Sequence, residues 1–184
     1  MTEFQHLLDP LESFYRAAGM ALPKAVKVES PKIPEPYRGL LAHQNDMTPT
    51  LEAAYGQRIH LRVLAAEQSA GVMLRQVSLV LDLSEQPVEF GAIRIQLANL
   101  LPEARGEILE GKLPLGRVLQ DFDIQHSSQP SAYFAVKPDV LIGAALQIDG
   151  YPLLYGRRNR LLLPSSAVLA EVVEILGPYD RASR

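Results

Sequence analysis

The sequence VMLRQVSLVL, residues 72–81, decides the fold class of this chain. It is almost continuously apolar, as expected for a buried strand, but it contains Arg75. Side chains of a strand alternate between its two faces, so Arg75 shares an apolar face with Met73, Val77 and Leu79. An unpaired guanidinium on such a face is costly, and we expect an anion beside it. The anion is either a ligand or a carboxylate of the protein, unless Arg75 lies at an edge and reaches solvent.

Segments on both sides of this strand predict further strands. They cover residues 59–63, 88–97, 133–148, 153–163 and 167–176. The last of them is apolar on both faces, which is typical of a central strand. With many strands, few helices and no βαβ rhythm, the sequence predicts an α+β fold in which helices flank a single antiparallel sheet.

Helices are expected mainly in the first third of the chain. Apolar spacing predicts one over residues 4–18. A second helix is expected to begin at Thr48 as the N-cap, followed by Pro49, and to end at Gly56. Between these helices, residues 24–36 are rich in proline and predict an extended connector. We therefore divide the chain into residues 1–36, an N-terminal helix and connector, and residues 37–180, the main domain.

Composition restricts the classes of function. The chain has 184 residues, a net charge of −3 and no cysteine. The absence of cysteine excludes disulfides, zinc ribbons and a cysteine nucleophile, and the interleaved charges predict no nucleic-acid partner. The four histidines lack metal-ligand spacing, so neither a metal site nor a cofactor is expected. No membrane helix or signal peptide is visible, which predicts a cytoplasmic protein without a membrane partner.

Charged residues in the last two predicted strands are further candidates. Glu171 and Glu174 are three positions apart, so they lie on opposite faces and at most one of them lines a given pocket. The alternative for each glutamate is a position at the end of the strand, where its side chain reaches solvent. In the same way Arg157 faces away from Arg158 and Arg160. One of these three arginines is a candidate for binding a carboxylate. The alternative is that they form a basic edge exposed to solvent.

In combination these segments resemble the chorismate lyase family. The resemblance covers roughly residues 39–178 and is carried by short motifs in order: Gly39-Leu40-Leu41, Asp46-Met47-Thr48, Leu74-Arg75, Pro114-Leu115-Gly116-Arg117, Tyr155-Gly156-Arg157-Arg158, and Glu174-Ile175-Leu176 before Pro178. It implies a chorismate lyase-like fold and a cofactor-free lyase that converts chorismate to 4-hydroxybenzoate and pyruvate, as a monomer or small homo-oligomer.

The resemblance also implies roles for individual residues. Arg75 and Glu174 would be catalytic, with Arg75 holding the ring carboxylate and Glu174 near the C4 hydroxyl. The residues that would bind the substrate are Met47, Leu115, Arg157 and Glu171, where Glu171 is also the fallback for Glu174.

Other functions are compatible with the same residues. The first is a non-catalytic, sensor-like domain of the same fold that binds a small aromatic carboxylate; only one convincing helix precedes Gly39, which argues against a complete regulator with a helix-turn-helix. The second is an enzyme acting on another aromatic or cyclohexadiene carboxylate. The third is a structural or partner-binding protein. This function is the least attractive of the three, because such a protein has no need of charged residues on apolar strand faces.

Overall fold

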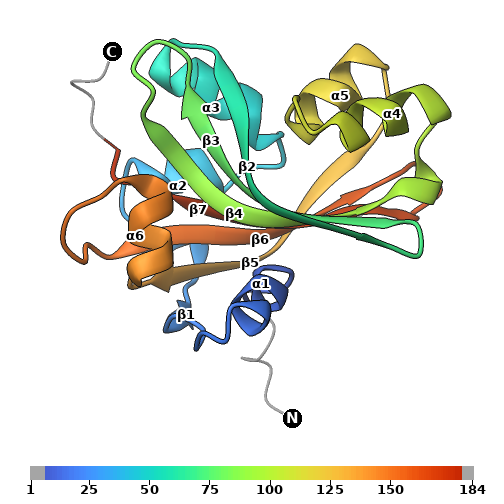
Figure 1. The fold of residues 1–184 in the computed structure, drawn as a ribbon. Coiled ribbons are helices and arrows are strands. Elements are labelled where there is room, and N and C mark those ends of the chain that lie inside the picture. The colour runs from blue at the N-terminus through green and yellow to red at the C-terminus, as the bar shows by residue number, and fades with distance from the viewer. Residues whose placement is uncertain (1–6, 180–184) are drawn as a thin grey trace.

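The strand that carries Arg75 lies second from one edge of a seven-stranded, entirely antiparallel sheet (Figure 1). The computed structural model describes residues 7–179 of the chain. The order of the strands is β1-β5-β6-β7-β4-β3-β2. Their bounds are β1 Ala25–Lys27, β2 Ile59–Ser69, β3 Val72–Leu81, β4 Pro87–Gln96, β5 Ser127–Val136, β6 Leu154–Leu162 and β7 Val168–Leu176.

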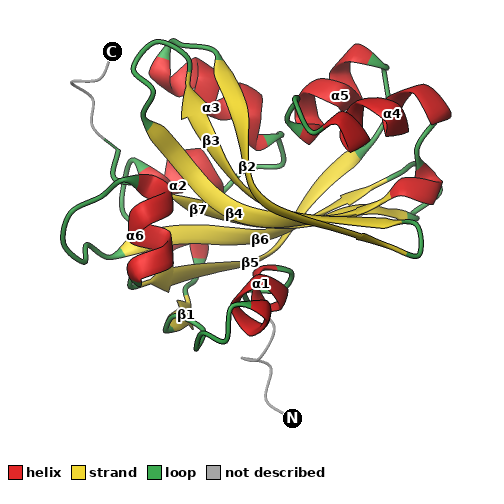
Figure 2. Ribbon diagram, in the orientation of Figure 1, coloured by secondary structure: helices red, strands yellow, loops and turns green. Residues whose placement is uncertain are grey.

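The helices are short and cover both faces of the sheet (Figure 2). Their bounds are α1 Leu11–Ala17, α2 Tyr37–Leu41, α3 Met47–Tyr55, α4 Pro102–Glu110, α5 Leu115–Asp121 and α6 Val140–Leu146, with 3-10 turns at Ser30–Lys32 and Leu97–Asn99. Helices α1 and α6 pack on one face, whereas α2 and α3, and separately α4 and α5, pack on the other. The predicted α+β fold with one antiparallel sheet and flanking helices is confirmed.

Two details position the later site. β7 lies in the middle of the sheet between β6 and β4, as its apolar pattern predicts. Gly91 on β4 lies so close to β7 that a Cβ atom there would overlap the carbonyl of Val173. Only glycine permits this approach, so the strands that carry the site residues are held tightly together.

Several predicted elements differ from the observed ones. The N-terminal helix spans only Leu11–Ala17, and the predicted part at residues 4–6 lies outside the described residues. The connector contains strand β1, which pairs with β5 at the sheet edge. Residues Val140–Leu146, predicted within a strand, form α6, because Asp139 caps the backbone N–H of Ile142. The division into residues 1–36 and 37–180 stays a prediction.

The second predicted helix is present, but its N-cap is shifted by two residues. α3 begins at Met47 after Asp46, and Gly56 ends it in the left-handed conformation with φ 65°, as predicted. Asp46 gives no side-chain capping bond. Its carboxylate contacts His126 instead, and this contact joins α3 to the loop before β5. Within residues 7–179, no helix is long and apolar enough to cross a membrane.

Candidate ligand-binding site

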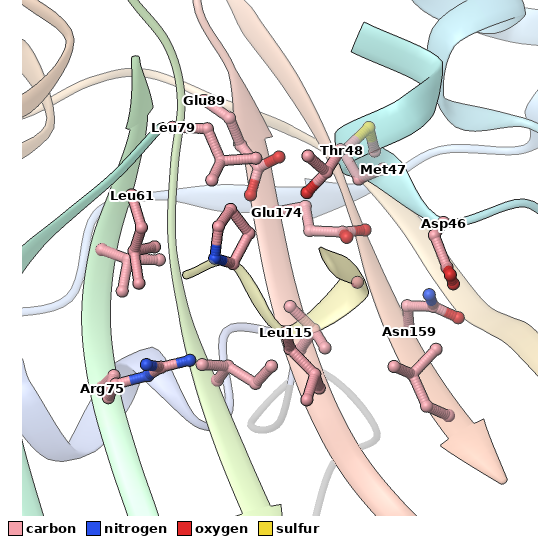
Figure 3. A pocket seen from close by; sticks show the side chains of 16 residues that line it. Asp46, Met47, Thr48, Leu61, Arg75, Leu79, Glu89, Leu115, Asn159 and Glu174 are labelled. Atoms are coloured by element: carbon pink, nitrogen blue, oxygen red, sulfur yellow. The ribbon is translucent and has the colours of Figure 1, made fainter. Parts of the chain in front are cut away.

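A cavity lies over the sheet between the first turns of α3 and α5 (Figure 3). Its cavity volume is about 70 Å³, measured as the space open to the centre of a water molecule. Most of its lining is aliphatic, with a few polar groups. The lining residues are Asp46, Met47, Thr48, Leu61, Arg75, Val77, Leu79, Glu89, Ile93, Pro114, Leu115, Gly116, Asn159, Leu161, Val172 and Glu174.

Arg75 provides a buried positive charge at one end of the cavity (Figure 3). Only 2% of the residue is exposed. Its Nη1 donates to the carbonyl of Ile108 over 3.5 Å, the limit of a hydrogen bond, and its Nε has no hydrogen-bond partner. No carboxylate among residues 7–179 forms an ion pair with it. Burial alone lowers its pKa to about 10, so Arg75 stays a cation near neutral pH and lacks an anion.

Glu174 lies toward the other end of the cavity and is paired with Arg157 (Figure 3). Both residues are buried. The guanidinium of Arg157 also donates to three backbone carbonyls, those of Leu41 (3.2 Å), His43 (3.1 Å) and Asn45 (3.2 Å). Arg157 is therefore fully partnered behind Glu174 and does not line the cavity.

Glu89 is a polar residue of this cavity that the sequence analysis missed, as it also missed Asn159. Glu89 is 4% exposed, and its Oε2 has no hydrogen-bond partner. Burial raises its pKa well above the ordinary value, the neighbouring Glu174 raises it further, and Arg157 opposes the shift only in part. The signal was present in the sequence, because Glu89 stands among the apolar residues of β4 just as Arg75 does in β3.

Glu171 lies on the opposite face of the sheet and does not line the cavity. Its Oε2 is 2.8 Å from Arg94 and its Oε1 is 3.3 Å from Arg158. Both arginines also pair with Asp9, which precedes α1. This four-residue network joins the N-terminal segment to the back of β4, β6 and β7, and it separates Glu171 from Glu174 as their odd spacing predicts.

Met47 and Leu115 bring two helix starts to the cavity. Met47 is the first residue of α3, and Leu115 is the first residue of α5 after Pro114. The first N–H groups of a helix have no partner within the helix. The structure therefore places Arg75, Glu174, Met47 and Leu115 around one cavity, and leaves Arg157 and Glu171 outside it.

Asp46, at the rim of the cavity, is joined to the loop before β5 by His126. The Nε2 of His126 is 3.0 Å from both carboxylate oxygens of Asp46, and its Nδ1 is 2.9 Å from the carbonyl of Ile124. Both ring nitrogens thus face acceptors, which the doubly protonated ring satisfies. Burial opposes protonation, but the carbonyl and the carboxylate together raise the pKa of His126.

This pair predicts a pH-dependent stability. A pKa raised by folding contributes stability that is complete below the unfolded value of 6.5 and is lost as the pH rises through the folded pKa. We expect the wild type to lose more stability between pH 6 and pH 8.5 than His126→Asn or Asp46→Asn. Thermal unfolding at several pH values measures this difference, and equal pH dependence in all three proteins would contradict it.

Comparisons with known proteins agree with this architecture. No family model and no curated protein sequence matches the chain. Among solved structures, PhnF from Mycobacterium smegmatis matches with a TM-score of 0.54 and 12% identity, over 90% of this chain and 92% of that one. The separate effector domain of PhnF matches with a TM-score of 0.54 and 13% identity, over 71% and 87%. The ligand-binding domain of a putative GntR-family transcriptional regulator from Bordetella bronchiseptica matches with a TM-score of 0.47 and 12% identity, over 65% and 85%.

These matches confirm the fold and correct the predicted activity. The chain has the chorismate lyase-like fold that the PhnF structures also have. The prediction of an enzyme, a carbon–oxygen lyase, is corrected, because the solved structures that match are PhnF and its effector domain and not a lyase. The predicted partners, chorismate with no nucleic acid, are contradicted by the same structures. The motifs that suggested the lyase are short, and one fold can serve several functions, so they do not establish the activity.

Proposed function

We propose that this chain is a sensor-like domain that binds a small aromatic carboxylate and releases it unchanged. The observation that carries the proposal is Arg75, a guanidinium that is 2% exposed and has no anion beside it. Such a charge is costly to bury unless an anion accompanies it for part of the time. Because Arg75 lines a cavity, a ligand can supply that anion.

The shape and chemistry of the arginine select the anion. A planar guanidinium binds a carboxylate through two parallel hydrogen bonds. The Nε of Arg75 is free, and its Nη1 is held only by the long bond to the carbonyl of Ile108. Leu115, the first residue of α5, lines the same cavity, and we assign it to the wall that contacts the ligand.

The remaining walls suit a ring. Side chains from six elements form the apolar part of the lining: Leu61, Val77, Leu79, Ile93, Leu115, Leu161 and Val172. Ligand sites of this kind combine apolar walls with a few convergent polar groups. We therefore favour an aromatic carboxylate over a purely polar anion.

Two observations favour binding over catalysis. Glu174 is held by Arg157, so it is not a free base beside the cavity. The effector domain of PhnF is a structural neighbour of this chain, and a sensing role extends that likeness to the cavity described here.

The test is a binding titration with benzoate and with benzamide, its uncharged counterpart. We expect saturable binding of benzoate by calorimetry and binding of benzamide that is weaker by about tenfold or more, because a hydrogen bond to a charged group contributes about 1.5–3 kcal/mol. Incubation with chorismate should leave it unchanged. Equal affinity for the two ligands, or no saturable binding of either, would refute the proposal.

A further inference from the structure

The end of the cavity away from Arg75 contains two carboxyl groups and only one cation. Glu89 and Glu174 both line the cavity, and Figure 3 shows both of them on the side away from Arg75. In the register of the sheet, Glu174 on β7 is opposite Gly91 on β4, two residues from Glu89. Such diagonal neighbours lie within side-chain reach of each other. This end therefore has a surplus of hydrogen-bond acceptors.

Arg157 does not relieve that surplus. All three guanidinium nitrogens are engaged, by Glu174 and by the carbonyls of Leu41, His43 and Asn45. Oε2 of Glu89 is thus a polar atom without a partner on a residue that is 96% buried, since its exposed fraction is 4%. A buried polar atom of this kind needs an explanation, and its position in the cavity wall indicates that the missing donor belongs to a ligand.

We propose that the Glu89 end of the cavity binds an ammonium group, so that the ligand is a zwitterion with its carboxylate at Arg75 and its amine at Glu89. This inference rests on the proposed function. The charges then balance at both ends: the carboxylate neutralises Arg75, and the ammonium neutralises Glu89, while Glu174 and Arg157 neutralise each other. Without the ligand, Glu89 avoids an unpaired charge by keeping its proton, in agreement with its raised pKa.

The two ends are far enough apart for one ring and a short arm. Arg75 is opposite Ile93 on β4, and Glu89 is four residues further along that strand. At about 3.4 Å per residue and 4.8 Å between strands, their Cα atoms are roughly 14 Å apart. The two side chains reach into the cavity from its two ends (Figure 3), so a benzoate with a one-carbon amine arm is an appropriate probe.

The experiment compares three benzoates that differ only at the far end: 4-(aminomethyl)benzoate, 4-(hydroxymethyl)benzoate and 4-methylbenzoate. By calorimetry we expect the wild type to bind the amine about tenfold to a hundredfold more tightly than the methyl compound, as for a hydrogen-bonded charge pair. Binding of the amine should release about one proton, from Glu89, seen as a dependence of the heat on the buffer. The other two ligands should release none.

Glu89→Gln keeps the shape of the side chain but cannot ionise. In this variant we expect the preference for the amine and the proton release to disappear, while 4-methylbenzoate binds as before. Glu67→Gln, on exposed β2, is the matched control and should behave as the wild type.

The outcomes separate the two proposals. If 4-methylbenzoate binds and the amine binds no better, the ammonium site is refuted and the carboxylate site stands. If none of the three ligands binds, the proposed function itself fails. The wild-type series decides between these outcomes even if Glu89→Gln does not fold.

Discussion

Arg75→Met is expected to abolish the binding of aromatic carboxylates and, at the same time, to raise the melting temperature of the free protein. Binding should fall by at least about tenfold to a hundredfold, the contribution of a charge-assisted hydrogen bond. Stability should rise because methionine fills a similar volume without a buried charge that has no ionic partner. Replacing buried charges by apolar residues stabilises proteins by up to about 1–4 kcal/mol, which corresponds to several degrees for a chain of this length.

The opposite signs of the two effects make this test specific. A merely structural arginine would be destabilising to remove and would leave binding unchanged at equal folded concentration. Arg160→Met is the matched control, because it removes the same charge from the exposed end of β6. Its benzoate affinity and melting temperature should stay close to those of the wild type. If Arg75→Met bound benzoate as the wild type does, the assignment of the carboxylate end would be wrong.

Face assignments were predicted from the sequence because strand alternation is local. The period of two places Arg75 with Val77 and Leu79 and puts Glu171 and Glu174 on opposite faces, and the structure has both arrangements. The same rule identifies the apolar β7 as a central strand. Local patterns suffice wherever a strand has one register and two distinct faces.

Partners across the sheet were not predictable in the same way. Nothing local shows that Arg157 is saturated by carbonyls of residues 41–45, more than 100 positions away in sequence. Helix α6 was also missed, because the apolar run Val140–Leu146 is compatible with a buried strand or a helix. The cap at Asp139 decides for the helix.

Function was the part least accessible from the sequence. The motifs around Arg75 and Leu115 describe how the fold builds a cavity, and a cavity of this shape serves binding as well as catalysis. Glu89 was overlooked although a lone carboxylate in an apolar strand is as unusual as a lone arginine. Its importance depends on its neighbour Glu174, and that contact comes only from the pairing of β4 with β7.

Arg157→Met is expected to cause the largest loss of stability of any substitution proposed for this protein. It leaves the carboxylate of Glu174 buried without its cation and leaves the carbonyls of Leu41, His43 and Asn45 without their donor. Breaking a buried pair by removing one partner costs about 3–5 kcal/mol. For a chain of this length the melting temperature should fall by roughly 10 °C or more.

Three further variants, Glu174→Met, the double variant and a control, separate the loss of the pair from the loss of packing. In Arg157→Met/Glu174→Met no unpaired charge remains, so part of the stability should return relative to Arg157→Met alone. Arg158→Met, at the adjacent position on the other face, is the matched control. Its ion pairs with Asp9 and Glu171 are partly exposed, with side chains 22–23% exposed, so the loss of stability should be smaller than that of Arg157→Met. Denaturant unfolding of the wild type, Arg157→Met, Glu174→Met and the double variant gives the coupling energy of the pair. Additive losses in the double variant would show that Arg157 stabilises α2 and α3 through its carbonyl contacts alone, and that Glu174 is not dependent on it.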